Sequence, residues 1–274
     1  MSRCGTRAGC APLAGATGGE GRKAMTYCCG ILVREGLVMM ADTRTNAGLD
    51  NISTFRKLHI FERPGESVLL LATAGNLSVS QGAIHLLDEG VPDPADETIT
   101  TRLIDAPSMS AAAHLVGIAT RLARTQASEG FEQSGVNFDV SFLLGGQIGG
   151  GGMRLFMVYA AGNAIECTID TPYFQIGEHK YGKPILDRAI SFDMELYDAL
   201  KIGLISMDST MRSNLSVGLP LDLALLRRDA LTLELSIRVD ASDAYFRDLR
   251  EQWSKALKAA HIAIPRPPYG GVQR

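Results

Sequence analysis

Runs of apolar and β-branched residues, divided by short turns, dominate the chain between residues 26 and 74. The turns at 34–36 and 63–66 each separate two such runs, which is the pattern of a β-hairpin. Successive strands joined by tight turns favour an antiparallel sheet. We therefore predict four strands, over residues 26–33, 37–41, 53–61 and 67–74.

Apolar residues then recur every three or four positions over residues 76–88 and 109–128, which predicts two helices. Strand patterns return afterwards, and we expect strands over residues 136–144, 153–160, 164–169, 173–177, 221–226 and 231–239. Two helices interrupt this series, one over residues 181–192 with Pro184 in its first turn and one capped by Asp193. A last helix, capped by Ser242, is expected to turn four residues inward: Leu249, Trp253, Ala256 and Ala260.

The elements come in blocks, without the regular alternation of strand and helix that a parallel sheet needs. This order predicts an α+β fold, in which two antiparallel sheets pack on each other with helices outside, a four-layer αββα sandwich. No internal repeat or linker divides residues 26–262, so we expect one domain there. Residues 1–25 are rich in Gly, Ala, Thr and Arg and are predicted to be a disordered leader, and 263–274 a tail.

The composition is that of an ordinary globular protein, with 46% hydrophobic and 21% charged residues and a formal net charge of -3. Phosphate binding requires clustered Lys and Arg, so neither nucleic acid nor an anionic membrane is an expected partner. No apolar run approaches the roughly 18 to 20 residues that cross a bilayer, and the leader lacks the features of a secretory signal. We therefore expect a cytoplasmic protein.

Common motifs of metal and nucleotide chemistry are missing from the sequence. The five cysteines include no CxxC pair, and the five histidines are scattered without ligand spacing, so no metal is predicted. Adjacent Cys28 and Cys29 are expected on opposite faces of a strand as small apolar side chains. There is no GxSxG, HExxH, Walker A or GxGxxG sequence, and the glycine run at 149–152 is predicted to be a hairpin loop. No cofactor is expected.

Thr26 offers a different source of activation if the peptide bond before it is absent. A free α-amine has a pKa of about 7.7 to 8.0, well below that of lysine, so part of it is neutral at pH 7 and can act as a base. A threonine hydroxyl beside its own amine then forms a self-contained nucleophile and base. A nearby lysine would lower the pKa of that amine, and a carboxylate would hold the lysine. Lys57 and Asp42 are the candidates for these two groups.

Thr26, Asp42-x-Arg44, Lys57 and the strand end at 73–75 together resemble the catalytic pattern of proteasome-type β subunits. The segments 137–146, 154–159 and 210–218 are similar to further parts of that family. The resemblance implies an N-terminal nucleophile hydrolase fold, with Thr26 as nucleophile, Asp42 and Lys57 as its charge partners and the backbone amide of Gly75 as oxyanion donor.

Several segments are closer still to the bacterial ancestral β subunit group, Anbu. They are 25–28, 45–48, 181–188 and 206–210, and the resemblance extends from Met25 to about His261. Two site positions depart from typical proteolytic β subunits. Glu178 stands where a serine is expected, and in the Asp-x-x-Ser pair Ser213 replaces the aspartate while Ser216 is retained. A Glu178 facing the cleft would raise the pKa of the amine and repel an oxyanion, whereas one facing solvent would do neither.

These residues lead us to expect a threonine-type peptidase or amidohydrolase that works through an acyl-enzyme ester. The same ester can pass its acyl group to an amine, so peptide ligation is an alternative, and a noncatalytic ring or filament subunit is a second one. The expected partners are a peptide or protein substrate and further copies of the chain, by family analogy. The sequence identifies no ATPase partner. Met25 before Thr26 resembles a removable initiator, so the leader is interpreted as an upstream start choice or, less favoured, a propeptide.

Overall fold

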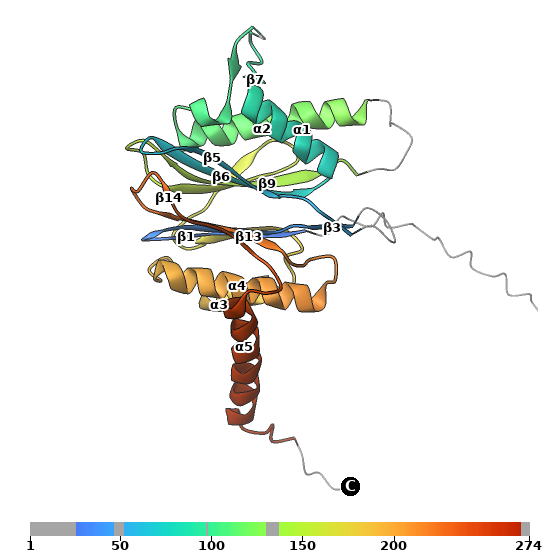
Figure 1. Cartoon of the computed structure of the whole chain (residues 1–274), viewed down its shortest axis with the longest axis vertical. Coiled ribbons are helices and arrows are strands. Elements are labelled where there is room, and N and C mark those ends of the chain that lie inside the picture. Colours follow the sequence, from blue (N-terminus) through green and yellow to red (C-terminus); the bar gives the residue numbers. More distant parts are fainter. Residues whose placement is uncertain (1–25, 47–51, 97, 130–136, 270–274) are drawn as a thin grey trace, which may run out of the picture.

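Two five-stranded antiparallel sheets lie face to face at the centre of the molecule (Figure 1). The computed structural model describes residues 26–46, 52–96, 98–129 and 137–269. The leader predicted at 1–25 lies outside the described residues. The first sheet has the strand order β12 (Tyr173–Gly177), β1 (Tyr27–Val33), β2 (Gly36–Asp42), β13 (Leu221–Arg227) and β14 (Leu233–Val239). The second has the order β11 (Ala164–Glu166), β10 (Arg154–Val158), β9 (Val140–Ile148), β6 (Ser67–Gly75) and β5 (Leu58–Arg63).

Helices cover the outer face of each sheet (Figure 1). Helices α1 (Leu77–Glu89) and α2 (Met109–Ser128) pack on the second sheet, and α3 (Lys183–Ala189) and α4 (Leu196–Ser213) lie on the first. A fifth helix, α5 (Ala244–Ala263), follows β14. Two small ladders, β3 (Arg44–Asn46) with β4 (Ile52–Thr54) and β7 (Val91–Pro92) with β8 (Thr100–Thr101), lie outside the main sheets. The prediction of antiparallel sheets in an α+β chain is confirmed.

Strand β1 is buried on both faces, and its alternation divides the core into layers. Cys28 and Leu32 point between the two sheets, whereas Tyr27, Cys29 and Ile31 point toward α3 and α4. The two adjacent cysteines therefore face opposite sides, as predicted. A third apolar cluster fills the space between the second sheet and α1 and α2.

The predicted boundaries agree closely with the structure for α2 and β12, but residues 53–61 do not form one strand. The backbone leaves the extended ladder at Phe55–Lys57 and separates β4 from β5. In this break the amide of Phe55 donates to the Thr43 carbonyl at 2.9 Å, and the carbonyl of Lys57 accepts from Thr73 at 3.0 Å. The prediction failed because no glycine or proline marks the break, which is fixed by hydrogen bonds to residues distant in the chain.

The predicted helix caps Asp193 and Ser242 are both wrong. Asp193 pairs with Arg34, and the N-terminal Leu196 amide of α4 donates instead to the Glu35 carboxylate at 3.2 Å. Ser242 bonds to Asp240, so the neighbouring Asp243 caps α5 by accepting from the Phe246 amide at 2.7 Å. At α4 the distant Glu35, and at α5 the adjacent Asp243, thus accepts from a free N–H group of the helix start.

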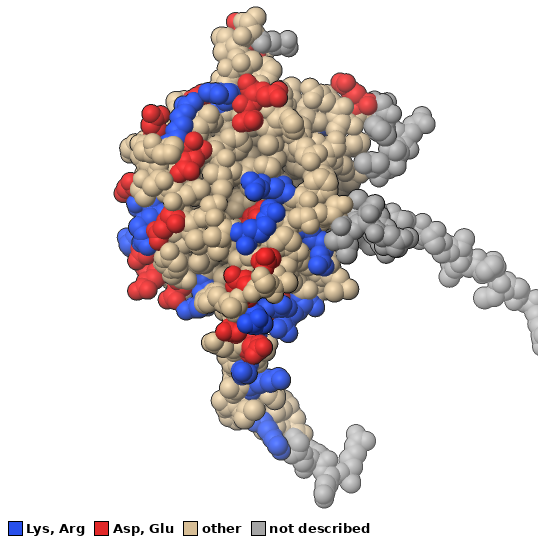
Figure 2. Space-filling view, in the orientation of Figure 1, with Lys and Arg blue, Asp and Glu red and all other residues tan. Residues whose placement is uncertain are grey.

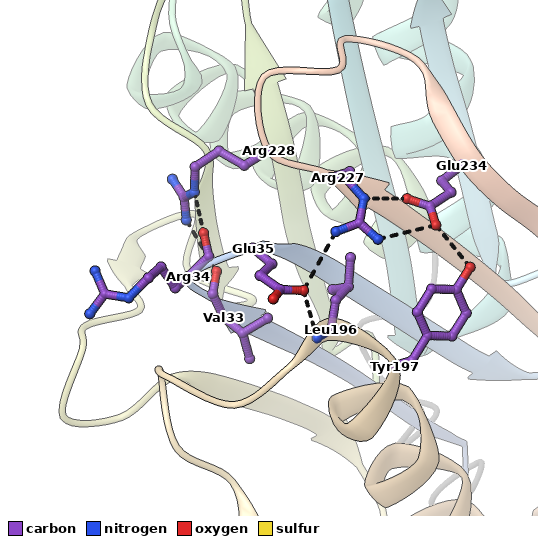
Figure 3. Close-up of polar contacts among 8 residues, drawn as sticks. All are labelled: Val33, Arg34, Glu35, Leu196, Tyr197, Arg227, Arg228 and Glu234. Carbon is purple, nitrogen blue, oxygen red and sulfur yellow. Dashed lines mark hydrogen bonds and ion pairs between the residues drawn. The ribbon is translucent and has the colours of Figure 1, made fainter.

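Figure 3 shows how the β1–β2 turn is fixed at the end of the sheet away from Thr26. Glu35 accepts from Leu196 and pairs with Arg227, which also bonds to Glu234. Arg228 donates to the backbone carbonyls of this turn. The helix dipole favours the Glu35 carboxylate at the N-terminus of α4. Through these contacts the network joins the turn, α4 and the β13–β14 hairpin.

Helix α5 projects away from the layered body (Figure 1). Of its residues only Phe246 and Leu249 are buried, and Trp253 is partly buried. The buried carboxylate of Asp208 on α4 pairs with both Arg212 and Arg250 and holds the base of the helix. Ala256 and Ala260 are exposed, so the prediction that they face inward is wrong.

Charges of both signs are interspersed on the face shown in Figure 2, in keeping with the small net charge. Among the described residues, no helix is long and apolar enough to cross a membrane.

Candidate active site

Thr26 lies immediately before β1 and is buried, with 5% of its surface exposed. Its carbonyl accepts a hydrogen bond of 2.6 Å from the amide of Glu178, which follows β12. Gly177, which precedes Glu178 and pairs with Tyr27 in the sheet, has φ +83, and a Cβ there would lie 1.9 Å from the Thr26 carbonyl oxygen. Only glycine permits this close approach of β12 to the start of β1.

Asp42 is the last residue of β2 and is completely buried. The ladder between β1 and β2 begins at Cys28 and Ala41, one pair farther from this end of the sheet. At the next position the Asp42 carboxylate replaces a backbone acceptor, because Oδ1 accepts from the Tyr27 amide at 3.1 Å. The carboxylate is thus fixed beside the peptide unit that joins Thr26 to Tyr27.

Lys57 reaches the same carboxylate from the break between β4 and β5. Its Nζ lies 2.9 Å from Asp42 Oδ1 and donates to the Arg44 carbonyl at 2.6 Å. Only 4% of the lysine is exposed. Lys57 precedes a strand of the second sheet and Asp42 ends a strand of the first, so this ion pair joins the two sheets at the end where Thr26 lies.

Burial raises the pKa of Asp42, while Lys57 and the amides of Tyr27 and Gly218 act in the opposite direction. Burial also raises the pKa of the Cys28 thiol well above its usual range, and the Asp42 charge adds to this effect. Cys28 Sγ donates to the Thr73 carbonyl at 3.4 Å. A protonated, buried thiol is a poor nucleophile, so these surroundings leave the threonine hydroxyl as the better candidate.

Gly75 ends β6, and Asn76 after it caps α1 by accepting from the Val79 amide. Gly75 has φ +115, and a Cβ there would lie 2.3 Å from the Asp139 carbonyl oxygen. The end of β6 is near the Thr26 region, since a Cβ on Gly177 would come within 3.5 Å of Ala74. The positive φ requires glycine at this strand-to-helix turn.

Glu178 is buried, with 9% of its surface exposed, so of the two alternatives for its side chain the solvent-facing one is excluded. Its two carboxylate oxygens accept from the Lys180 amide and from the Asn214 side chain, each at 3.2 Å. Asn214 is itself buried and accepts from the Ser216 amide at 3.0 Å. The Glu178 carboxylate therefore lies inside the protein, and the backbone amide of the same residue bonds Thr26.

Asp42 and Lys57 lie together beside Thr26, but the two predicted serines are less buried. Ser213 is exposed at the last position of α4, and Ser216 is partly exposed in the following loop. Asn214, between them, makes the contact to Glu178, and sequence reasoning missed it. Its signal was weak, because an asparagine just after a helix commonly serves only as a cap or turn residue. Among the described residues, no group of three or more side chains is placed to hold a metal ion.

Several solved structures similar to this chain carry the name Anbu. The Gly-1 mutant of Anbu from Hyphomicrobium sp. strain MC1 is 47% identical, with a TM-score of 0.80, over 88% of this chain and 99% of that one. Anbu from Yersinia bercovieri, the ancestral β subunit, is 45% identical with a TM-score of 0.81, over 89% and 100%. The helical assembly of the Anbu complex from Pseudomonas aeruginosa is 46% identical with a TM-score of 0.82, over 89% and 99%. No family model and no curated protein matches the sequence. Identity of this extent over nearly the full length of the relatives shows that the chain belongs to the Anbu family, the ancestral β subunits of the bacterial proteasome-like proteins.

Proposed function

We propose that this protein is a threonine-type N-terminal nucleophile hydrolase that cleaves peptide or related amide bonds. The observation that carries the proposal is the buried Lys57–Asp42 ion pair, which is fixed beside the peptide unit between Thr26 and Tyr27. Removing an ammonium from water costs free energy, so a buried lysine beside Thr26 supports a role in activating the neighbouring amine and hydroxyl. The two stacked sheets with outer helices are in keeping with the fold of that hydrolase class.

In the proposed reaction the Thr26 hydroxyl oxygen attacks the substrate carbonyl carbon. The neutral α-amine of Thr26 takes the hydroxyl proton through a bridging water. The tetrahedral oxyanion accepts a hydrogen bond from the Gly75 backbone N–H, and the Lys57 ammonium stabilises the same negative charge. The C–N bond then breaks, and the protonated α-amine of Thr26 gives its proton to the leaving amine. The α-amine then takes a proton from a water molecule, which attacks the ester carbon. The acid is released and the Thr26 hydroxyl is restored.

This mechanism requires the bond between Met25 and Thr26 to be cut, because an amide nitrogen is not a base. The buried Glu178 carboxylate affects the same step, since a negative charge near the amine favours its protonated form. We therefore propose that the reaction speeds up from pH 6 to pH 9, as the amine loses its proton. Ser213 and Ser216 belong to the proposal as groups beside the amine, and Asn214 joins them through its contact with Glu178.

Self-assembly is part of the proposed function. The relative from Pseudomonas aeruginosa forms a helical assembly. We propose that this chain also forms a homo-oligomer, with a peptide or protein as its substrate.

The test uses a β-lactone, whose ring opens on attack by an alcohol and leaves an ester. Intact-mass measurement of protein made from the native gene first shows whether the mature chain begins at Thr26. We expect one lactone per chain in the wild type, none in Thr26→Ala, and normal labelling in Thr120→Ala, whose buried threonine lies in α2 and donates to the Val116 carbonyl of the same helix. Digestion assigns the modified residue.

Two results would overturn the proposal. One is a mature chain that still begins at Met1, and the other is a chain that begins at Thr26 but forms no ester. The second result would favour a noncatalytic assembly subunit. Peptide products formed with and without an added amine then separate hydrolysis from acyl transfer.

A further inference from the structure

Tyr27, the residue after Thr26, is completely buried, and its hydroxyl lies in a closed set of hydrogen bonds beneath α4. The hydroxyl lies 2.7 Å from Ser206 Oγ, and Ser206 Oγ donates to the Gly182 carbonyl at 3.0 Å. The side-chain amide of Gln175 donates to the Tyr27 hydroxyl. These contacts fix one direction: Gln175 donates to Tyr27, Tyr27 to Ser206, and Ser206 to Gly182.

The space around this hydroxyl is shaped for it. A Cβ on Gly182 would lie 2.3 Å from the Tyr27 oxygen and 2.5 Å from Ser206 Oγ, so a larger residue at position 182 would displace the cluster. Burial raises the pKa of Tyr27 well above its usual range, and the hydroxyl therefore stays a neutral donor at any working pH. Strand β12 and helix α4 supply the two partners of the hydroxyl, and the segment before α3 supplies the acceptor of Ser206.

The other end of Tyr27 faces the proposed catalytic pair. The Tyr27 amide donates to Asp42 Oδ1, the same oxygen that binds Lys57. Backbone pairing between β1 and β2 begins only at Cys28, the residue after Tyr27. On the β2 side, the peptide unit between Thr26 and Tyr27 is therefore held by a side chain rather than by the sheet. On the β12 side, the Thr26 carbonyl of the same unit accepts from the Glu178 amide. The hydrogen-bonded Tyr27 side chain adds a third point of attachment next to these two.

We infer that the Tyr27 hydroxyl, bonded to Ser206, is a positioning device that orients Thr26 toward the Lys57–Asp42 pair. The inference rests on the proposed function. Tyr27 touches no reacting atom in it; it sets the plane of the peptide unit that carries the Thr26 hydroxyl and amine. Displacements of about 1 Å at a reacting group can cost two orders of magnitude in rate, so loss of this anchor should slow the chemical step.

Three single variants test the inference. Tyr27→Phe keeps the ring and the amide but removes the hydroxyl, and Ser206→Ala removes its acceptor. Tyr173→Phe is the matched control: Tyr173 is a buried tyrosine of β12 whose hydroxyl bonds to Asp187 and Lys183 instead. The mature protein is treated with the β-lactone, and the maximal labelling rate and the apparent dissociation constant of the lactone are measured separately.

We expect Tyr27→Phe and Ser206→Ala each to lower the maximal rate by about tenfold or more without changing the dissociation constant. The double variant should be no slower than Tyr27→Phe alone, because both changes break one connection. Tyr173→Phe should stay within about twofold of the wild type. Wild-type rates in Tyr27→Phe, an equal loss in Tyr173→Phe, or multiplied losses in the double variant would each refute the positioning role.

A second measurement separates this inference from the proposed function. Amide hydrogen exchange in the peptide that contains Tyr27 and Cys28 should be faster in Tyr27→Phe than in the wild type and unchanged in Tyr173→Phe. This holds whether or not the protein forms an ester. A wild type that does not react, with exchange that responds as expected, would refute the hydrolase and leave the anchor. Unchanged exchange in Tyr27→Phe would refute the anchor.

Discussion

The ion pair between Lys57 and Asp42 is nearly free of water, with 4% and 0% of the two residues exposed. Such a pair stabilises a fold weakly, because the cost of removing two charges from water offsets their attraction. Loss of one partner is different, since the other charge then stays buried without compensation. The pair thus makes the two residues depend strongly on each other.

We expect Lys57→Met to lower the free energy of unfolding by about 3 to 5 kcal/mol. Adding Asp42→Asn should restore part of this loss, because asparagine carries no charge and still accepts from the Tyr27 amide. Lys201→Met is the control: it breaks an exposed pair with Asp198 and should cost less than about 1 kcal/mol. Urea denaturation measures all of these, and a Lys57→Met loss as small as the control's would contradict the argument.

At the scale of elements, the turn from β6 into α1 depends on Gly75. The residue combines φ +115 with a close approach to the Asp139 carbonyl. Gly65, in the β5–β6 turn, has φ +80 but no atom within 4 Å of its hypothetical Cβ. The two glycines therefore separate the cost of a left-handed backbone from the cost of a clash.

Gly65→Ala should cost about 1 to 2 kcal/mol of stability, the usual penalty for a side chain in this conformation. Gly75→Ala should cost clearly more, since the added methyl also meets the Asp139 carbonyl, and we expect it to slow β-lactone labelling as well. Thermal unfolding and labelling rates of both variants check this. Equal destabilisation would show that the turn yields without strain.

Much of the element order could be predicted because apolar periodicity is local. The ends of α2 and β12 follow directly from it, as does the division of Cys28 and Cys29 between two faces. The break at Phe55–Lys57 could not be predicted, because it contains no glycine or proline and is fixed by a bond to the distant Thr43. The α5 cap failed for another reason: Ser242 and Asp243 are both good caps, and a competing bond to Asp240 decides between them.

The candidate site was predictable only in part. Lys57 and Asp42 lie together as expected, although their catalytic roles stay predictions. The Tyr27–Ser206 contact joins residues 179 positions apart, and no local pattern marks such a pair. The replacement of an expected aspartate by Ser213 could be noticed in the sequence, but not that Asn214 makes the contact to Glu178.

At the scale of the whole molecule, α5 differs from the other helices in how little its own chain covers it. Beyond Ser254 the helix is exposed, including Leu257 at 51% and Ile262 at 79%. Apolar side chains left in this way add nothing to the stability of the subunit that carries them. An exposed apolar surface of this kind is a candidate contact in the proposed self-assembly.

Leu257→Lys and Ile262→Lys should therefore change the free energy of unfolding by less than about 0.5 kcal/mol. Leu249→Ala, at the buried base of the same helix, should cost about 2 to 4 kcal/mol. Urea denaturation at low protein concentration makes the comparison. A large loss in either lysine variant under those conditions would mean that the outer turns of α5 do support the fold.

Trp253 is the only tryptophan of the chain, and it lies where α5 leaves the body. Indole emission responds to the polarity of its surroundings, and all indole emission of this chain comes from this one junction. The protein thus carries its own optical reporter: a blue shift with rising concentration would reveal that neighbouring molecules cover the helix, without any dye being attached.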